Sequence, residues 1–190
     1  MTPRSLVHAI IVFMVISHGL VTAAPLQPVA GGTWSEQAGN LVGRLVVAQK
    51  KIKASEYFLL TLELRNVGIM PLAFPTGNPF TLTVRVLDGA GKQVNSTMVR
   101  MDVLCSPQWA VLPKASYLGF PVSIKGADGA TGAHLDTTTS IWKLSPGTYR
   151  IDAEYSSDRF GEFKAKPTNI TLWQGKLMLP AIDVEIEKGD

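Results

Sequence analysis

The sequence predicts an all-β protein whose strands form an antiparallel sandwich of two sheets. Three observations support this prediction. Several short stretches alternate apolar and polar residues, turn residues separate them, and no stretch beyond the N-terminal segment repeats apolar side chains with a helical period. Roughly seven or more such strands in one domain are typical of a sandwich, and a closed barrel is the alternative.

The first residues are typical of a secretory signal peptide. Arg4 precedes an apolar run over Ala9–Ile16, and small residues follow up to Ala24. The apolar run is shorter than the roughly 20 residues of a membrane-spanning helix. We therefore expect residues 1–23 to be removed by cleavage after Ala23. The mature chain would then be secreted or periplasmic, with no membrane insertion.

Residues 24–40 predict an extended N-terminal leader, because they are rich in Pro, Gly, Ala and polar residues and show no periodicity. The pattern changes after Asn40, and we expect one β-sandwich domain over residues 41–190. The clearest strand is predicted over 57–66. Its apolar side chains share one face, as a half-buried strand requires (Phe58, Leu60, Leu62 and Leu64). Asn66-Val67-Gly68 then predicts a turn in which Gly68 takes a positive φ.

A second alternating strand is predicted from Phe80 to Val86, and Asp88-Gly89 followed by Ala90-Gly91 predicts a hairpin into residues 92–94. Weaker strands are expected over 96–104 and 117–124. Two late stretches alternate clearly. Residues 148–155 place Tyr149, Ile151, Ala153 and Tyr155 on one face, and residues 182–187 do the same with Ile182, Val184 and Ile186.

The order of these elements resembles the opening of bacterial immunoglobulin-like domains. Over residues 41–74 a strand, a polar stretch and a second strand lead into the Asn-Val-Gly turn and a Pro-Leu strand start. The run Leu144–Ile151 is similar to the Leu-x-Pro-Gly-x-Tyr entry to a late strand. The resemblance covers about residues 41–187 and implies an immunoglobulin-like sandwich. It also implies that Tyr149 packs inward with its hydroxyl bonded to nearby backbone. A looser resemblance is to small β-sandwich proteinase inhibitors of bacilli.

Charge and cysteine content exclude several classes. The formal net charge is +3, and the basic residues are spread along the chain without a basic patch, so we expect no binding to nucleic acid. Cys105 is the only cysteine, so no intramolecular disulfide can form. Asn95 and Asn169 begin Asn-x-Thr sequons, which matter only where exported proteins are glycosylated.

Few residues are candidates for catalysis. His8 and His18 leave with the signal peptide, and His134 lies in a small-residue loop over Lys125–Ser140. Asp136 could orient His134, and Ser140 could serve as nucleophile, with Asp128 nearby. The chain has no Gly-x-Ser-x-Gly motif, and a solvated loop explains the same residues better.

Paired carboxylates offer a second candidate site. Asp152 and Glu154 lie two residues apart on a predicted strand, a spacing that glycosidases can use. The alternation explains them equally as the wet face of that strand, and the same holds for Asp183, Glu185 and Glu187.

Soft-metal and sugar binding are the remaining alternatives. Met98, Met101 and Cys105 lie close in sequence and could ligate copper, although a methionine that fills the core explains them better. The four tryptophans fall near predicted loops or strand ends, where their rings could stack on sugars or cap the core (Trp34, Trp109, Trp142 and Trp173).

We therefore expect no catalytic residue, no metal site and no cofactor. The favoured interpretation is an exported, non-enzymatic immunoglobulin-like domain. It would serve protein interaction or a structural role in the cell envelope, with a protein as the partner and contacts through loops or an exposed sheet edge. The alternatives are a proteinase inhibitor that inserts the loop Lys125–Ser140 into a protease cleft, and a carbohydrate-binding module.

Overall fold

The computed structural model of the chain describes residues 30–54, 59–76, 82–98, 108–122, 133–137, 140–157 and 169–188. Every regular element within these ranges is a β-strand, so the prediction of an all-β protein is confirmed. In the same ranges, no helical stretch has the length and hydropathy of a membrane span. Residues 1–23, the predicted signal peptide, lie outside the described part of the chain.

The strands are short, apart from two long ones near the C-terminus. In chain order they are β1 (Ala30–Gly31), β2 (Leu41–Val47), β3 (Lys51–Lys53), β4 (Leu60–Asn66), β5 (Leu72–Thr76), β6 (Leu82–Asp88), β7 (Thr97–Met98), β8 (Gln108–Leu112), β9 (Tyr117–Pro121), β10 (Ala133–Asp136), β11 (Ser140–Leu144), β12 (Gly147–Ser156), β13 (Thr171–Leu172) and β14 (Lys176–Glu187).

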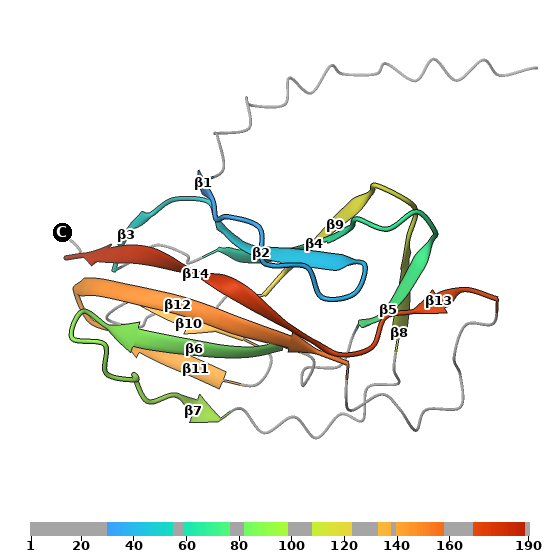
Figure 1. The fold of residues 1–190 in the computed structure, drawn as a ribbon. Helices are drawn as coiled ribbons and strands as arrows, with labels where there is room; N and C mark the ends of the chain where they lie inside the picture. Colours follow the sequence, from blue (N-terminus) through green and yellow to red (C-terminus); the bar gives the residue numbers. More distant parts are fainter. Residues whose placement is uncertain are drawn as a thin grey trace, which may run out of the picture.

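The described strands form four open sheets (Figure 1). Two have four strands, in the orders β1-β2-β4-β9 and β3-β14-β12-β6, and two have three strands, in the orders β10-β11-β7 and β13-β5-β8. Most neighbouring strands are antiparallel, as predicted, but β3 pairs with β14 and β13 with β5 in parallel. Parallel pairs need long connections, and both of these join strands far apart in the sequence.

The two four-stranded sheets pack face to face through β2 and β14. Gly43 lies at the closest approach, because a Cβ atom there would be 2.6 Å from Cδ2 of Leu179 and 2.9 Å from Cδ2 of Leu177. The buried side chains form one hydrophobic cluster to which strands of all four sheets contribute. Burial of this apolar surface is the main favourable term in folding.

The predicted alternation of buried and exposed side chains is confirmed in β4, β12 and β14. Leu60, Leu62 and Leu64 of β4 are buried, while Arg65 is exposed. In β12 and β14 the apolar residues are buried at every second position over Tyr149–Tyr155 and Ile182–Ile186. Alternate side chains of a strand point to opposite faces, so one face joins the core and the other meets solvent.

The turn after β4 differs in one detail. The Asn66 side chain accepts the Gly68 N–H at 2.9 Å, which forms the predicted turn. Gly68 does not take the positive φ that we expected. A glycine is needed there for close approach instead, because a Cβ atom would lie 2.7 Å from Cγ of Asn40.

The described part of the predicted leader, residues 30–40, packs against the sheet. β1 pairs with β2, and Ser35 receives the Gly43 N–H on its hydroxyl at 3.0 Å. The indole N–H of Trp173 donates to the Ala38 carbonyl at 2.9 Å. These bonds explain how a stretch without periodicity is ordered: it is held by single contacts and not by a buried face.

Candidate functional site

The predicted loop Lys125–Ser140 is not a loop over residues 133–136, which form β10. His134 and Asp136 lie on this strand, with His134 opposite Lys143 of β11. The Thr137 N–H and hydroxyl donate to the Ser140 carbonyl at 2.8 and 3.0 Å and close the hairpin. Leu135 is buried opposite the buried Trp142, which anchors the hairpin in the core. Asp128 and the first part of the loop lie outside the described residues.

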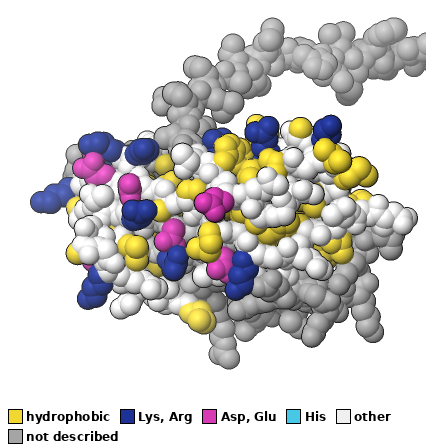
Figure 2. All heavy atoms as spheres, viewed as in Figure 1, with side chains coloured by type: hydrophobic (Ala, Val, Ile, Leu, Met, Phe, Trp, Pro, Cys, Tyr) yellow, Lys and Arg dark blue, Asp and Glu magenta, His cyan; other side chains and the backbone are white. Residues whose placement is uncertain are grey.

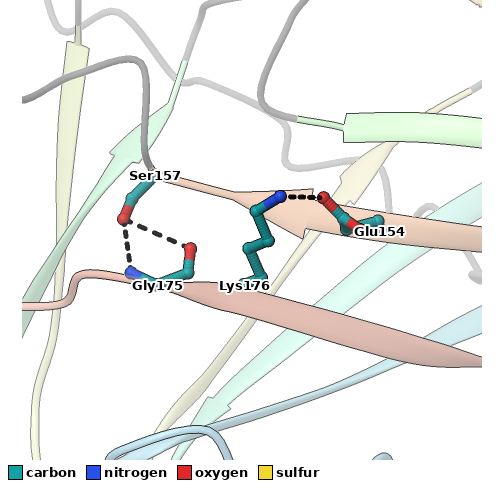
Figure 3. A network of polar contacts seen from close by, with 4 residues as sticks. All are labelled: Glu154, Ser157, Gly175 and Lys176. Carbon is teal, nitrogen blue, oxygen red and sulfur yellow. Dashed lines mark hydrogen bonds and ion pairs between the residues drawn. The ribbon is translucent and has the colours of Figure 1, made fainter.

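The Asp152 and Glu154 carboxylates lie on the outer face of β12 in ion pairs. Asp152 Oδ1 is 2.7 Å from Nε of Arg85 on β6, and Glu154 Oε1 is 3.6 Å from Nζ of Lys176 on β14. Figure 3 shows the second pair beside the end of β12, where the Ser157 hydroxyl accepts the Gly175 N–H at 2.8 Å. These contacts match the interpretation of a wet strand face.

The acidic residues of β14 are held in the same way. Lys51 Nζ lies 3.1 Å from a Glu185 oxygen and 3.5 Å from a Glu187 oxygen. The hydrogen bond and charge of Glu185, followed by the charge of Glu187, raise the pKa of Lys51. No three His, Cys, Asp or Glu side chains of the described residues are grouped to hold a metal ion.

Met98 is not part of the core. It lies on β7 with 84% of its surface exposed, so the expectation that it fills the core is wrong. Among the described residues, β7 lies at the edge of its sheet. Met101 and Cys105 lie outside the described residues, so the relative positions of the three candidate copper ligands are not described.

The tryptophans are mostly unsuited to stacking on a sugar. Trp142 is buried at the centre of β11, where a strand end was expected, and Trp173 is buried between β13 and β14. Trp34 lies beneath the guanidinium of Arg44, 4.6 Å from the ring centroid. Trp109 belongs to β8 and is half-buried. Asn95 and Asn169 of the two sequons are both exposed.

A hollow of about 290 Å³ lies beside the hairpin that follows β6. Its lining includes Asp88, Thr148, Arg150 and Asp183. The Asp88 carboxylate is already used by the turn, since it accepts the Ala90 and Lys92 N–H groups at 2.9 Å each. The turn therefore occupies one of the two carboxylates that line the hollow.

A more distinctive feature is an exposed apolar surface where β5, β8 and β9 meet. We call this surface the apolar end; its members are Val67, Ile69, Met70, Val111, Tyr117 and Leu118. Ile69 is 78% exposed, Tyr117 65% and Met70 60%. Figure 2 shows hydrophobic side chains gathered over this end, at the upper right of the view. Several large apolar side chains exposed at one end of a protein are typical of interaction sites.

Asn66 joins the segments that carry the apolar end. It is fully buried, and its amide nitrogen lies 2.8 Å from the Met70 carbonyl, 3.0 Å from that of Leu112 and 3.2 Å from that of Pro113. Its backbone N–H donates to Ser116. One side chain thus fixes the loop before β5 against the end of β8 and the turn into β9 (Figure 1).

β9 is the last strand of its sheet, and it pairs with β4 on one side only. The Val122 N–H donates to Leu60, and the Ser116 carbonyl accepts from Asn66. Hydrogen-bonded pairs alternate along an antiparallel ladder, so the N–H and C=O groups of Tyr117 and Gly119 point away from β4. No described residue pairs with them. A row of backbone N–H and C=O groups without partners can bind another strand.

The charge around β9 is positive. Arg65 lies opposite Tyr117 in the register with β4, and Lys114 lies in the turn before β9; both are exposed. Neither has an ion pair among the described residues. The nearest acid of β4, Glu63, is held by Arg44 at 2.7 Å. The surface therefore combines apolar side chains, a strand edge that pairs with no described residue, and two cations.

No local pattern in the sequence predicted the apolar end. One signal was available, because Val67 lies inside the predicted turn Asn66-Val67-Gly68 and two further large apolar residues, Ile69 and Met70, follow it directly. In comparisons with known proteins, no protein-family model and no curated protein matched the chain.

Proposed function

We propose that the chain is an exported, non-enzymatic immunoglobulin-like domain that binds another protein through the apolar end and the open edge of β9. The observation that carries this proposal is the coincidence of the two features on one surface, held rigid by Asn66. Either feature alone occurs in many proteins. Together they offer both backbone hydrogen bonds and apolar contacts to a partner.

Several contacts support the immunoglobulin-like part of the proposal. The Tyr149 hydroxyl donates to the Ser145 carbonyl at 2.8 Å, four residues upstream, as a tyrosine corner requires. The facing pair of sheets and the buried alternation of β4, β12 and β14 agree with such a sandwich.

Site-specific photocrosslinking tests the binding surface. A photoreactive phenylalanine would replace Tyr117 or Ile69 in the full-length chain, expressed in its native envelope, and Thr83 as an exposed control on β6. We expect crosslinks to one protein from positions 117 and 69 and none from position 83. Equal crosslinking from all three positions, or none from any, would contradict the proposal.

Export is a separate part of the proposal, with its own measurement. The chain purified from medium or periplasm should begin at Ala24, as determined by N-terminal sequencing, because cleavage is expected after Ala23. A chain that begins at Met1 and stays with the membrane fraction would contradict it.

The inhibitor alternative is favoured by no specific observation, since residues 133–136 of its proposed inserting loop are paired in a strand. A panel of secreted proteases assayed with micromolar protein would decide it. Inhibition that is lost on cleavage within Lys125–Ser140 would replace the present proposal.

A further inference from the structure

The edge of β9 sets the register of any strand that adds to it. Tyr117 and Gly119 each direct one N–H and one C=O outward, and Pro121 adds a carbonyl but no N–H. An added strand therefore forms hydrogen-bonded pairs at Tyr117 and Gly119. Pro121 ends the row of donors, which limits the added strand to a short segment.

The side chains of the added strand would meet two different environments. Residues opposite Leu118 and Phe120 would face the inner, apolar side of the sheet, where these two side chains pair with Leu64 and Leu62. Residues opposite Tyr117 and Gly119 would lie on the outer side. Gly119 has no side chain there, so it leaves room beside Glu63 and Thr61 for a side chain that crosses the edge.

The outer side is positively charged. The residue opposite Tyr117 would lie two strand spacings, roughly 10 Å, from the Arg65 backbone, within reach of two long side chains. Lys114 lies three positions before Tyr117 in the turn. An acidic side chain at this point would be attracted to Arg65, and a basic one would be repelled.

We infer that the partner supplies an extended peptide segment with an acidic residue opposite Tyr117 and apolar residues opposite Leu118 and Phe120, and that this segment adds to β9 as a further strand. The inference rests on the proposed function and names the chemistry of its partner. A second copy of this chain is a poorer occupant. β9 itself, Tyr117–Pro121, contains no acidic residue that could meet Arg65 of the other copy.

Peptide binding tests the inference directly. The probe is a fluorescein-labelled peptide in which Val alternates with Glu, and its counterpart carries Lys in place of Glu. We expect the acidic peptide to raise the fluorescence anisotropy on titration with the mature chain, and the basic peptide to bind at least about tenfold more weakly. Failure of the acidic peptide to bind, or equal binding of both, would overturn the inference.

Gly119 offers a matched pair of variants. Gly119→Pro removes the outward N–H but no hydrogen bond to β4, because proline is tolerated on the open side of an edge strand. Gly119→Ala keeps that N–H, and its Cβ atom would have no contact closer than 3.4 Å. We expect Gly119→Pro to weaken binding of the acidic peptide about tenfold more than Gly119→Ala does. Equal affinity of the two variants would overturn strand addition.

A charge variant gives a second measurement that does not depend on proline at position 119. Arg65→Glu should weaken binding of the acidic peptide about tenfold. The same change at exposed Lys92, in the hairpin after β6, should leave the affinity of the peptide unchanged. An equal effect of both variants would overturn the predicted contact with Arg65.

The two proposals fail in different ways. If the crosslinks from position 117 persist in Gly119→Pro, the interaction surface stands and strand addition is wrong. If position 117 gives no crosslink in the unaltered chain, the proposed function itself is wrong. A wild-type dimer in sedimentation that becomes a monomer in Gly119→Pro would identify a second copy as the occupant and overturn the acidic segment.

Discussion

Asn66 shows how one buried polar residue can determine the geometry of a surface. Its amide donates toward three carbonyls and its oxygen accepts one N–H, so it satisfies backbone groups from two separate segments, the loop before β5 and the end of β8. The sequence placed Asn66 at the end of a predicted strand and in a turn motif. It could not show the carbonyls that Asn66 meets, because Leu112 and Pro113 are distant in sequence.

Replacing Asn66 with Asp should strongly destabilise the fold. A carboxylate would direct oxygens at buried carbonyls and leave them without a donor, at a cost of about 3 kcal/mol in the free energy of unfolding. Urea unfolding at pH 7 measures the loss. Asn95→Asp, at an exposed position, is the matched control, with an expected change below about 0.5 kcal/mol. Equal effects of the two changes would show that Asn66 does not link the segments.

Tyr155 makes stability depend on pH in the alkaline range. It is buried between Phe74 and Trp173, its hydroxyl donates to the Pro75 carbonyl, and burial raises its pKa. Because the folded state holds the proton more tightly than the unfolded state, this contribution is complete below a pH of about 10 and is lost as the pH rises further. Burial also raises the pKa of Tyr149.

We therefore expect the free energy of unfolding to fall between about pH 10 and pH 11, by up to roughly 1.4 kcal/mol per pH unit for each such tyrosine. Tyr155→Phe should give a shallower slope in urea unfolding measured at pH 9, 10 and 11. Tyr117→Phe, at the exposed edge, is the control for loss of a tyrosine. Identical slopes for wild type and Tyr155→Phe would contradict the assignment.

At the scale of elements, alternation predicted the strands that have one wet face, β4, β6, β12 and β14. It could not predict β5, which is buried on both faces at four successive positions. It also missed β10, where Leu135 is a single apolar anchor among small and polar residues. A period of two in hydropathy arises only where a sheet separates core from water.

The contact between β2 and β14 depends on Gly43, which leads to a prediction about sheet packing. Gly43→Ala would place a methyl group 2.6 to 2.9 Å from three leucine side chains of the core. Overpacking of this kind costs about 1–3 kcal/mol. Gly119→Ala, where the nearest atoms are at 3.4 Å, should cost much less. Thermal unfolding of both variants provides the comparison, and similar midpoints would show that the two sheets can separate without cost.

At the scale of the whole molecule, the sequence predicted the composition of the core better than the surface. The apolar end combines a loop, a strand end and a turn that only the tertiary fold brings together, so no local pattern marked it. The same reason explains residues 30–40. Their contacts to β2 and to Trp173 are made by single groups that are separated along the chain. Such contacts produce no regular alternation of apolar and polar residues in the sequence.

Two truncations distinguish a packed segment from a tether. A chain that begins at Ala30 keeps the bonds from Gly32 to Leu45 and from Ser35 to Gly43, whereas a chain that begins at Leu41 loses them and leaves the Trp173 indole N–H without its acceptor. Each lost hydrogen bond costs about 1 kcal/mol. The free energy of unfolding of the shorter chain should therefore be lower by at least about 3 kcal/mol. Urea unfolding of both chains measures the difference. Equal midpoints would mean that residues 30–40 only cover the sheet, and a loss confined to the shorter chain would mean that they complete it.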